Sequence, residues 1–546
     1  MSTPCILLLL ASAGAGLRAA AADNGSTMKV TQSASKIETY DSLEITVSYQ
    51  EPCPVNPFTD VSVSGIFELD DGGRTAVDGF CDSPDGTVYR VRFMPVKPGD
   101  YAYTVEIEGS GTARKFKGEF TAVKGKRRGM VRVDPAHPWH FLWEGTDEHY
   151  FYNGTTAYFI AGLDEAGIAK AINRLADLEI NRVRAALTGR VANGRGWFED
   201  VHPSNRFSFL LSPWETDEPG SVENPGYDVT RFDTTYWRKF ERILSRARAR
   251  DIAVSVLMYV DGMRAGTDPF KDDPGGEDER RYYRYAAARL SSFSNVMWDI
   301  TNEYQVFRND SWAEKMGAFL KECDPYGHLM SIHGQPEFNF RTSPWADFAL
   351  YQAWDEWGGH GFMLNNRRLQ AETGRPIPQV NEEYGYEDHY PTGWGDNRKA
   401  PARSADNRRR LAWEMCMAGC YQTTGERATP AGGWINGAGD KSMRMLKGYA
   451  IMKGFFESFE WWRTEPRDDL VSGGGYCLAV PGDTYAVYLP GGAPGSVKIE
   501  PGRYKARLYN PRTGRWSGLP SASGPLFVLY RTPDSKDWAA LLTRAD

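Results

Sequence analysis

The sequence predicts a multidomain protein in which a (β/α)8 barrel, a TIM barrel, is flanked by two β-sandwich domains of the immunoglobulin or fibronectin type. The chain has 546 residues, which is too many for one ordinary hydrophobic core. Its first and last parts are short alternating runs broken by glycine, proline and aspartate, as in β-sandwiches. Its middle part alternates short apolar runs with long helical patterns, which is typical of βα units.

The first residues have the pattern of a secretory signal peptide. An apolar run over residues 5–13 is followed by small residues up to position 22, although the usual positive charges before the run are missing. No later stretch reaches the roughly 20 apolar residues that a transmembrane helix needs. We therefore expect a signal peptide over residues 1–22, a secreted or periplasmic bacterial protein and no membrane span.

Residues 23–125 are expected to form the N-terminal β-sandwich, and the basic run "KGKRRG" at 124–129 is expected to lead out of it. Runs such as "LEITVSYQ" and "VYRVRF" alternate apolar and polar residues with the period of a strand, and no helical period occurs. Cys53 and Cys81 lie in this domain. They could form a disulfide after export, or they could be two buried thiols.

Residues 126–465 are expected to form the barrel, and residues 466–546 the C-terminal β-sandwich. Helical runs at 164–179 and 234–251 separate strand candidates, and eight strands in this length fit a (β/α)8 barrel. The eight strand candidates are residues 149–159, 180–187, 252–262, 295–304, 329–335, 347–354, 377–385 and 416–426.

Composition excludes some classes of function. A formal net charge of −7 argues against a nucleic-acid partner, because such proteins present a basic face. The cysteines lack the CxxC spacing of zinc sites, and the acidic loop at 268–279 lacks the spacing of a calcium loop. We expect no metal and no organic cofactor. The 17 Trp, 28 Tyr and 26 Phe could stack on sugars, although large cores also use them.

Polar and aromatic residues gather where the predicted strands end, and in a parallel barrel this face carries the chemistry. The fourth strand ends in "NEY" with Glu303, and the seventh ends in "NEEYG" with Glu382 and Glu383. Cleavage of a glycosidic bond needs two carboxyl groups, one to protonate the leaving oxygen and one to attack or stabilise the anomeric carbon. We interpret Glu303 and Glu383 as this pair. The substrate-binding residues expected around them are Arg184, Tyr259, Asn302, His333, Gln352, Trp354, Tyr386 and Trp434.

Strand alternation is the argument for Glu383 over Glu382. Gln379, Asn381 and Glu383 share one face of the seventh strand, and their polarity suggests that this face lines the barrel interior. Glu382 is then expected on the outer face or in a supporting role. A bulge at the strand end would reverse this register. In the fourth strand the same rule turns Glu303 inward and Asn302 outward, so a distortion is expected there if both serve the site.

These motifs resemble a known family. "WDITNEY" and "NEEYGYE" resemble clan A glycoside hydrolases, and "NGTTAY", "QVNEEYGYED" and "GGWINGAGD" resemble the apiosidase-like subgroup of bacterial barrels. The resemblance implies that Glu303 is the acid/base and Glu383 the nucleophile, with Arg184 and Trp434 matching the clan's second-strand arginine and eighth-strand aromatic residue. The N-terminal part resembles the sandwich that often precedes such barrels, and the tail resembles a collagen-binding-like module.

We therefore expect a retaining glycoside hydrolase that cleaves plant, algal or bacterial polysaccharides or oligosaccharides by double displacement. The subgroup is diverse, so the motifs do not specify a sugar, a linkage, or exo against endo action. The alternative is a non-catalytic secreted glycan-binding protein with a degenerate barrel. A matrix-binding adhesin is a third reading, which rests on the tail alone. For His333 and the three aromatic residues at positions 354, 386 and 434, a structural role is the competing interpretation.

Overall fold

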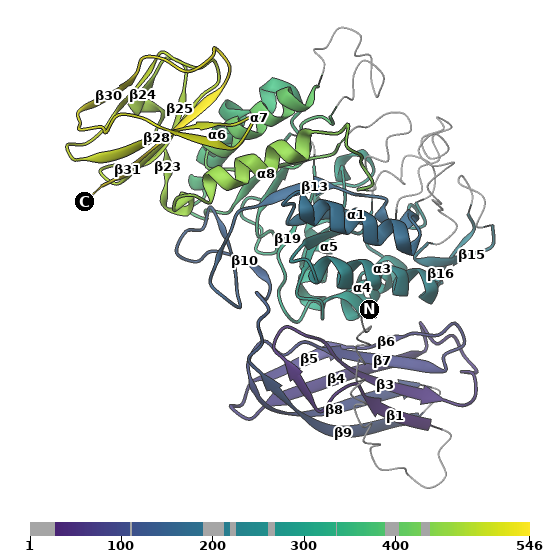
Figure 1. Cartoon of the computed structure of the whole chain (residues 1–546). Helices are drawn as coiled ribbons and strands as arrows, with labels where there is room; N and C mark the ends of the chain where they lie inside the picture. Colours follow the sequence, from purple (N-terminus) through teal and green to yellow (C-terminus); the bar gives the residue numbers. More distant parts are fainter. Residues whose placement is uncertain are drawn as a thin grey trace, which may run out of the picture. The chain divides into compact units, whose positions relative to one another are not determined.

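The computed structural model describes residues 28–109, 112–188, 212–218, 225–259, 268–334, 336–387, 403–426 and 437–545. The chain divides into two compact units, one ending at Gly125 and the other beginning at Lys126. Figure 1 shows the strands of the first unit in purple, and the barrel and the C-terminal sheets of the second unit in blue to yellow. The multidomain fold class predicted from the sequence is confirmed.

The N-terminal unit consists of two facing sheets. Phe67 and Phe93, one from each sheet, stack with ring centroids 4.1 Å apart in the core between them. Cys53 and Cys81 are free thiols. One sheet has the order β1 (Met28–Gln32), β3 (Leu43–Tyr49), β7 (Val88–Phe93) and β6 (Phe80–Cys81), and the other has the order β2 (Lys36–Glu38), β9 (Thr112–Val123), β8 (Gly99–Gly109), β4 (Val61–Leu69) and β5 (Arg74–Asp78).

The barrel has eight parallel strands, each paired with the next in chain order except β19 with β20, and β13 pairs with β22. An isolated parallel bridge between His333 and Leu350 joins the two remaining edges and completes the ring. Every strand lies inside one of the eight predicted ranges. The strands are β13 (Asn153–Thr156), β14 (Arg182–Ala186), β17 (Ala253–Leu257), β18 (Val296–Asp299), β19 (Met330–Ser331), β20 (Ala349–Tyr351), β21 (Gln379–Asn381) and β22 (Tyr421–Thr424).

The helices around the barrel begin and end at the signals that the sequence carries. In α1, the Asp164 side chain caps the helix by accepting from the backbone N–H of Gly167 at 2.8 Å, and an apolar stripe with Ile168 and Ile172 is buried. The helices are α1 (Glu165–Asp177), α3 (Thr234–Arg248), α4 (Glu277–Leu290), α5 (Asp310–Cys323), α6 (His360–Ala371), α7 (Ala405–Met417) and α8 (Met445–Phe456).

Short elements complete this part of the chain. Strands β10 (Val131–Val133), β11 (Phe141–Trp143) and β12 (His149–Tyr150) form a small sheet, and β15 (Trp214–Thr216) pairs with β16 (Tyr227–Phe232). The described 3-10 turns are η1 (Ile160–Gly162), η3 (Tyr304–Val306), η4 (Asp355–Gly358), η6 (Trp461–Arg463) and η7 (Asp468–Leu470). Within the described ranges, no helix is both long and apolar enough to cross a membrane.

The C-terminal sheets pack on the barrel helices within the second unit. Arg409 of α7 forms a buried ion pair with Asp537, with Nη1 2.5 Å from Oδ2 and Nη2 3.0 Å from Oδ1, and Tyr488 donates to the same carboxylate. One sheet contains β23 (Glu465–Pro466), β25 (Tyr476–Val480), β26 (Thr484–Leu489), β31 (Trp538–Arg544), β28 (Tyr504–Asn510) and β29 (Arg515–Gly518), and the other contains β24 (Val471–Ser472), β27 (Gly495–Lys498) and β30 (Leu526–Leu529).

Candidate active site

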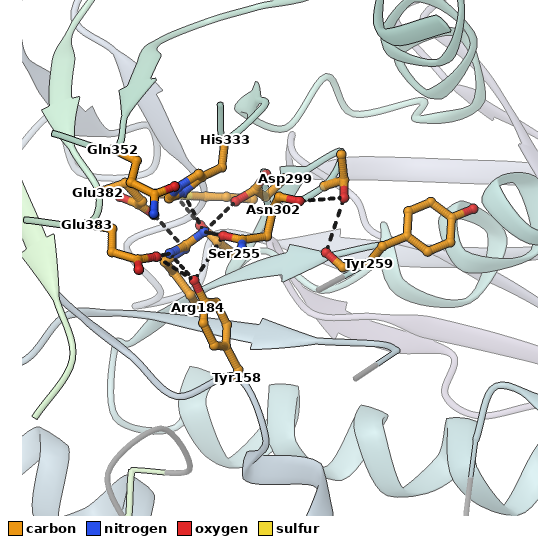
Figure 2. A network of polar contacts seen from close by, with 12 residues as sticks. Tyr158, Arg184, Ser255, Tyr259, Asp299, Asn302, His333, Gln352, Glu382 and Glu383 are labelled. Atoms are coloured by element: carbon orange, nitrogen blue, oxygen red, sulfur yellow. Dashed lines mark hydrogen bonds and ion pairs between the residues drawn. The ribbon is translucent and has the colours of Figure 1, made fainter. Parts of the chain in front are cut away.

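Two arginines on β14 form the centre of the site. Arg182 and Arg184 are two residues apart on one strand, so their side chains share the inner face, and both are fully buried. The Glu382 carboxylate lies between them, with Oε1 2.5 Å from Arg182 Nη1 and 2.9 Å from Arg184 Nε. Tyr152 Oη donates to the other oxygen of Glu382 at 3.3 Å. Glu382 is therefore the charge partner of the arginine pair (Figure 2).

This geometry corrects the expected register of β21. Gln379 accepts from Tyr351 Oη at 2.5 Å, and the Tyr351 ring packs on Phe362 of α6. The Asn381 side chain donates to backbone carbonyls in the connection between β20 and α6. The expectation that Gln379 and Asn381 line the interior is wrong, because their amides bind groups on the helix side. The inner position belongs to Glu382.

Glu383 also reaches the interior, although it follows Glu382 directly. Strand β21 ends at Asn381, so strict alternation no longer applies to the two glutamates. Glu383 Oε2 accepts from Tyr158 Oη at 3.2 Å and lies 3.9 Å from Arg184 Nη1. Tyr158 Oη in turn accepts from that same Nη1 at 2.6 Å. Glu383 thus lies above the arginine pair, on the side of the strand ends.

The chain is distorted after β18, where the sequence analysis expected a distortion. Glu303 has φ 49° and ψ 50°, a left-handed conformation that is uncommon for a residue with a side chain and is often found at functional sites. Asn302 Oδ1 accepts from Arg184 Nη2 at 2.9 Å and lies 3.0 Å from Tyr158 Oη, whose single hydrogen it shares with Glu383. Because of this turn, consecutive Asn302 and Glu303 both join the network around Arg184.

A chain of hydrogen bonds joins Arg184 to Glu303. Arg184 Nη2 lies 2.7 Å from His333 Nδ1, and His333 Nε2 lies 3.2 Å from Gln352 Oε1. Gln352 Nε2 donates to Glu303 Oε1 at 2.8 Å. Burial, together with the nearby Arg184 charge, lowers the pKa of His333 well below its usual value, so the imidazole is neutral.

Asp299 is a further carboxyl group on the inner face. Its Oδ2 lies 3.5 Å from Arg184 Nη2, the nitrogen that also donates to Asn302 and His333. Burial raises the pKa of Asp299 to about 7, against the lowering effect of Arg184 and with a further contribution from the charge of Glu382. Asp299 therefore gains or loses its proton close to neutral pH.

The structure does not bring every predicted residue to this network. The Tyr259 ring points away from it (Figure 2), and its hydroxyl donates to Glu279 of α4 at 2.9 Å inside an aromatic cluster. A substrate contact through the Tyr259 side chain is therefore not supported, because the residue faces the helices. Trp434 lies outside the described residues.

Trp354 and Tyr386 lie together beyond the strand ends. Their rings meet edge to face with centroids 6.0 Å apart, and the Arg403 guanidinium lies 4.5 Å from the centre of the Trp354 ring. Arg403 is held by Asp355 through two bonds of 2.6 and 2.8 Å. The role of this group in substrate binding stays a prediction.

Sequence reasoning missed several members of the network. Arg182 lies two residues before Arg184, so alternation alone could have placed it on the inner face. Alternation along the fourth strand places Asp299 on the inner face with Glu303, but no sequence motif indicated that Asp299 belongs to the site. Tyr158 follows the end of β13, and its distance in sequence from both glutamates hid its role. Among the described residues, no group of three or more histidine, cysteine, aspartate or glutamate side chains could hold a metal ion.

Comparison with known proteins agrees with this architecture. Residues 206–427, which include Glu303 and Glu383, match the model of the apiosidase-like catalytic domain. Over this range the chain is similar to the apiosidase-like catalytic domain. The match to this domain begins after β14, so Arg184 and Tyr158 lie outside the matched range. Residues 36–108 match a domain of unknown function, DUF5060. The resemblance of the C-terminal sheets to a collagen-binding-like module stays a prediction.

Solved structures share the fold. One is a predicted glycoside hydrolase from Bacteroides vulgatus ATCC 8482, with 22% identity and a TM-score of 0.74, and the alignment covers 94% of this chain and 100% of that one. Another is a family 5 glycoside hydrolase from the same organism, with 16% identity and a TM-score of 0.58, covering 77% of this chain and 94% of that one. No curated protein matches this chain significantly in sequence.

Proposed function

We propose that the protein is a retaining glycoside hydrolase that acts on polysaccharides or oligosaccharides, with Glu383 as nucleophile and Glu303 as acid/base. The observation that carries the proposal is the convergence of two carboxylates on one buried arginine. Glu383 contacts the Arg184 network through Tyr158, and Glu303 contacts it through Gln352 and His333. The two come from the ends of the fourth and seventh barrel strands, and double displacement requires such a pair of carboxyl groups facing one site.

Glu383 suits the nucleophile better than Glu382 does. Both arginines of β14 bind one oxygen of Glu382, and Tyr152 binds the other, so its lone pairs are committed to the core. Glu383 is one residue nearer the strand ends. Tyr158 Oη and the Arg184 guanidinium lie 3.2 and 3.9 Å from its Oε2, so a donor and a positive charge face the carboxylate that is to attack.

The reaction then has two steps. In the first, Glu383 attacks the anomeric carbon while Glu303 gives its proton to the leaving oxygen, and a glycosyl ester forms on Glu383. In the second, Glu303 removes a proton from water, the water oxygen attacks the anomeric carbon, and the bond to Glu383 breaks. Each step inverts the anomeric carbon, so the product keeps the configuration of the substrate.

The proposed substrate class is supported by the catalytic-domain match and by the paired carboxylates. The identity of the sugar has to be determined by assay. We also propose that the protein is exported, because its first residues resemble a signal peptide. Export would bring the enzyme to polymers that do not enter the cell.

A screen tests the proposal. The purified protein is incubated with aryl glycosides and with plant, algal and bacterial polysaccharides, and product sugars are measured for the wild type and for Glu303→Gln and Glu383→Gln. We expect hydrolysis of at least one substrate by the wild type and its loss in both variants. Binding of a glycan without hydrolysis by the wild type would instead support the non-catalytic alternative.

A further inference from the structure

We infer that Gln352, oriented by His333, is a positioning residue that makes Glu303 Oε1 a permanent acceptor and so assigns the catalytic proton to the other oxygen. The inference rests on the proposed function, because it gives the acid/base glutamate its geometry. The sequence placed Gln352 and His333 among the expected substrate-binding residues, with a structural role as the alternative for His333.

The direction of each hydrogen bond follows from the one before it. A guanidinium can only donate, so His333 Nδ1 must accept from Arg184. A neutral imidazole whose Nδ1 accepts carries its hydrogen on Nε2, which therefore donates to Gln352. The Gln352 amide oxygen is then fixed on the His333 side, and its NH2 group faces Glu303.

The orientation of Gln352 decides where Glu303 holds its proton. The Gln352 NH2 group can only donate, so the Glu303 oxygen beside it, Oε1, has to accept. A protonated carboxyl group has one accepting oxygen and one O–H. The proton is therefore directed to Oε2, and the acid has one orientation rather than two.

The relay keeps this geometry over a wide pH range. Arginine stays charged, glutamine does not titrate, and burial beside Arg184 lowers the pKa of His333 well below its usual value. Other charged groups around the relay are Arg182, Asp299, Glu382 and Glu383, all contacting Arg184 or its partners.

The fold holds the relay at the seam of the barrel. His333 follows β19, Gln352 follows β20, and the bridge between His333 and Leu350 is the pairing that joins these strands. The two relay residues are thus held together by the backbone contact that closes the ring. Further bonds join the same two segments, from Asp347 N to Met330 O at 2.8 Å and from Ser331 Oγ to Phe348 O at 2.6 Å, so closure of the barrel here holds His333 and Gln352 side by side.

The test compares leaving groups. Gln352→Met removes the donor at similar length, and Gln379→Met is the matched control, since Gln379 is a buried barrel glutamine on the outer face. The substrates are aryl glycosides of the sugar that the screen identifies, carrying phenols of increasing acidity. An acidic phenol leaves without protonation, so a defect in acid catalysis disappears with it.

For Gln352→Met we expect kcat/KM to fall about 100-fold with the least acidic phenol, within the ~10²–10⁴-fold range of general acid catalysis, and to stay near wild type with 2,4-dinitrophenol. Gln379→Met should show no dependence on the leaving group beyond that of the wild type. An equal loss on all phenols in Gln352→Met, or no loss, would overturn the inference.

A second measurement does not depend on activity. Nitrogen NMR of 15N-histidine-labelled protein, with His333→Asn to assign the signal, reports the tautomer of His333. We expect a neutral ring protonated at Nε2 throughout about pH 5 to 8. Protonation at Nδ1, or titration in this window, would overturn the relay even in an active enzyme. The expected tautomer without hydrolysis of any substrate would overturn the proposed function and leave the relay standing.

Discussion

Glu382 and Glu383 are neighbours in sequence but occupy different levels of the barrel: Glu382 is fully buried between two arginines, and Glu383 contacts Tyr158 above them. The adjacent carboxylates can therefore divide two tasks. Glu382 neutralises the buried charge of Arg182 and Arg184, and Glu383 faces the side on which substrate would bind.

Glu382→Gln should mainly lower stability, and Glu383→Gln should mainly abolish activity. Glu382→Gln leaves two buried guanidinium groups without their shared partner, so we expect a loss of about 3–5 kcal/mol in the free energy of unfolding. Glu383→Gln should leave unfolding within about 1 kcal/mol of wild type but abolish turnover. Urea unfolding and hydrolysis assays on both variants make the comparison. If Glu382→Gln lost turnover with a stable fold while Glu383→Gln stayed active, Glu382 would be the nucleophile and the assignment of the two residues would be reversed.

Tyr158→Phe tests the link between Arg184 and Glu383. The Tyr158 hydroxyl accepts from Arg184, and its single hydrogen is shared between Asn302 at 3.0 Å and Glu383 at 3.2 Å. Tyr158 lies outside the range matched by the catalytic-domain model. Removal of the hydroxyl should lower kcat/KM by about 10- to 100-fold, because a donor worth about 1–3 kcal/mol is lost beside the nucleophile. Steady-state kinetics measure the change. Unchanged kinetics would show that Glu383 does not depend on this donor.

Asp299 should make stability depend on pH. Its folded pKa, about 7, is above the ordinary value, so between about pH 4 and 7 the unfolded chain has lost this proton and the folded chain keeps it. The free energy of unfolding then falls with rising pH by up to about 1.4 kcal/mol per unit and levels off above pH 7.

Asp299→Asn mimics the protonated side chain at every pH and removes this contribution. Urea unfolding of wild type and variant from pH 5 to about pH 8 should show a stability difference that grows in favour of the variant and then becomes constant. Parallel curves for the two proteins would mean that Asp299 is already ionised at pH 5.

The ion pair between Arg409 and Asp537 should hold the C-terminal sheets on α7. Both groups are buried, and Asp537 also accepts from Tyr488. Arg409→Met should lower the free energy of unfolding by about 3–5 kcal/mol, since it removes the nearest cation of the buried carboxylate and leaves only Arg512, at 3.7 Å. The exposed neighbour Arg410 provides the control, and Arg410→Met should change stability by less than about 0.5 kcal/mol. Thermal unfolding of both variants measures the difference. Equal changes in melting temperature would show that the Arg409–Asp537 ion pair does not stabilise the fold.

The fold could be predicted from sequence because periodicity is a local property. All eight barrel strands and helices α1 and α3 lie inside the ranges that alternation and helical spacing indicated. The register at β21 could not be predicted in the same way. Polarity suggested an inner face for Gln379 and Asn381, but both side chains satisfy groups toward α6, which only the folded chain brings near.

Site residues could be predicted where their type and their position at a strand end are enough to suggest a role. They could not be predicted where the role depends on partners far away in the sequence. Glu303 and Glu383 stood out because carboxylates at the ends of two barrel strands suit one known chemistry. The relay through His333 and Gln352 depends on the closure of β19 against β20, and no local pattern encodes it. Tyr259 was misjudged because a strand end does not say which way a side chain turns.

The most direct test of the central claim is to locate the covalent intermediate. The wild type is treated with a 2-deoxy-2-fluoro glycoside of the identified sugar that carries an activated leaving group, and the labelled peptide is sequenced by mass spectrometry. A retaining mechanism with these roles predicts one glycosyl group, attached to Glu383. Attachment to Glu382 or Glu303, or a product of inverted configuration with no adduct, would contradict it.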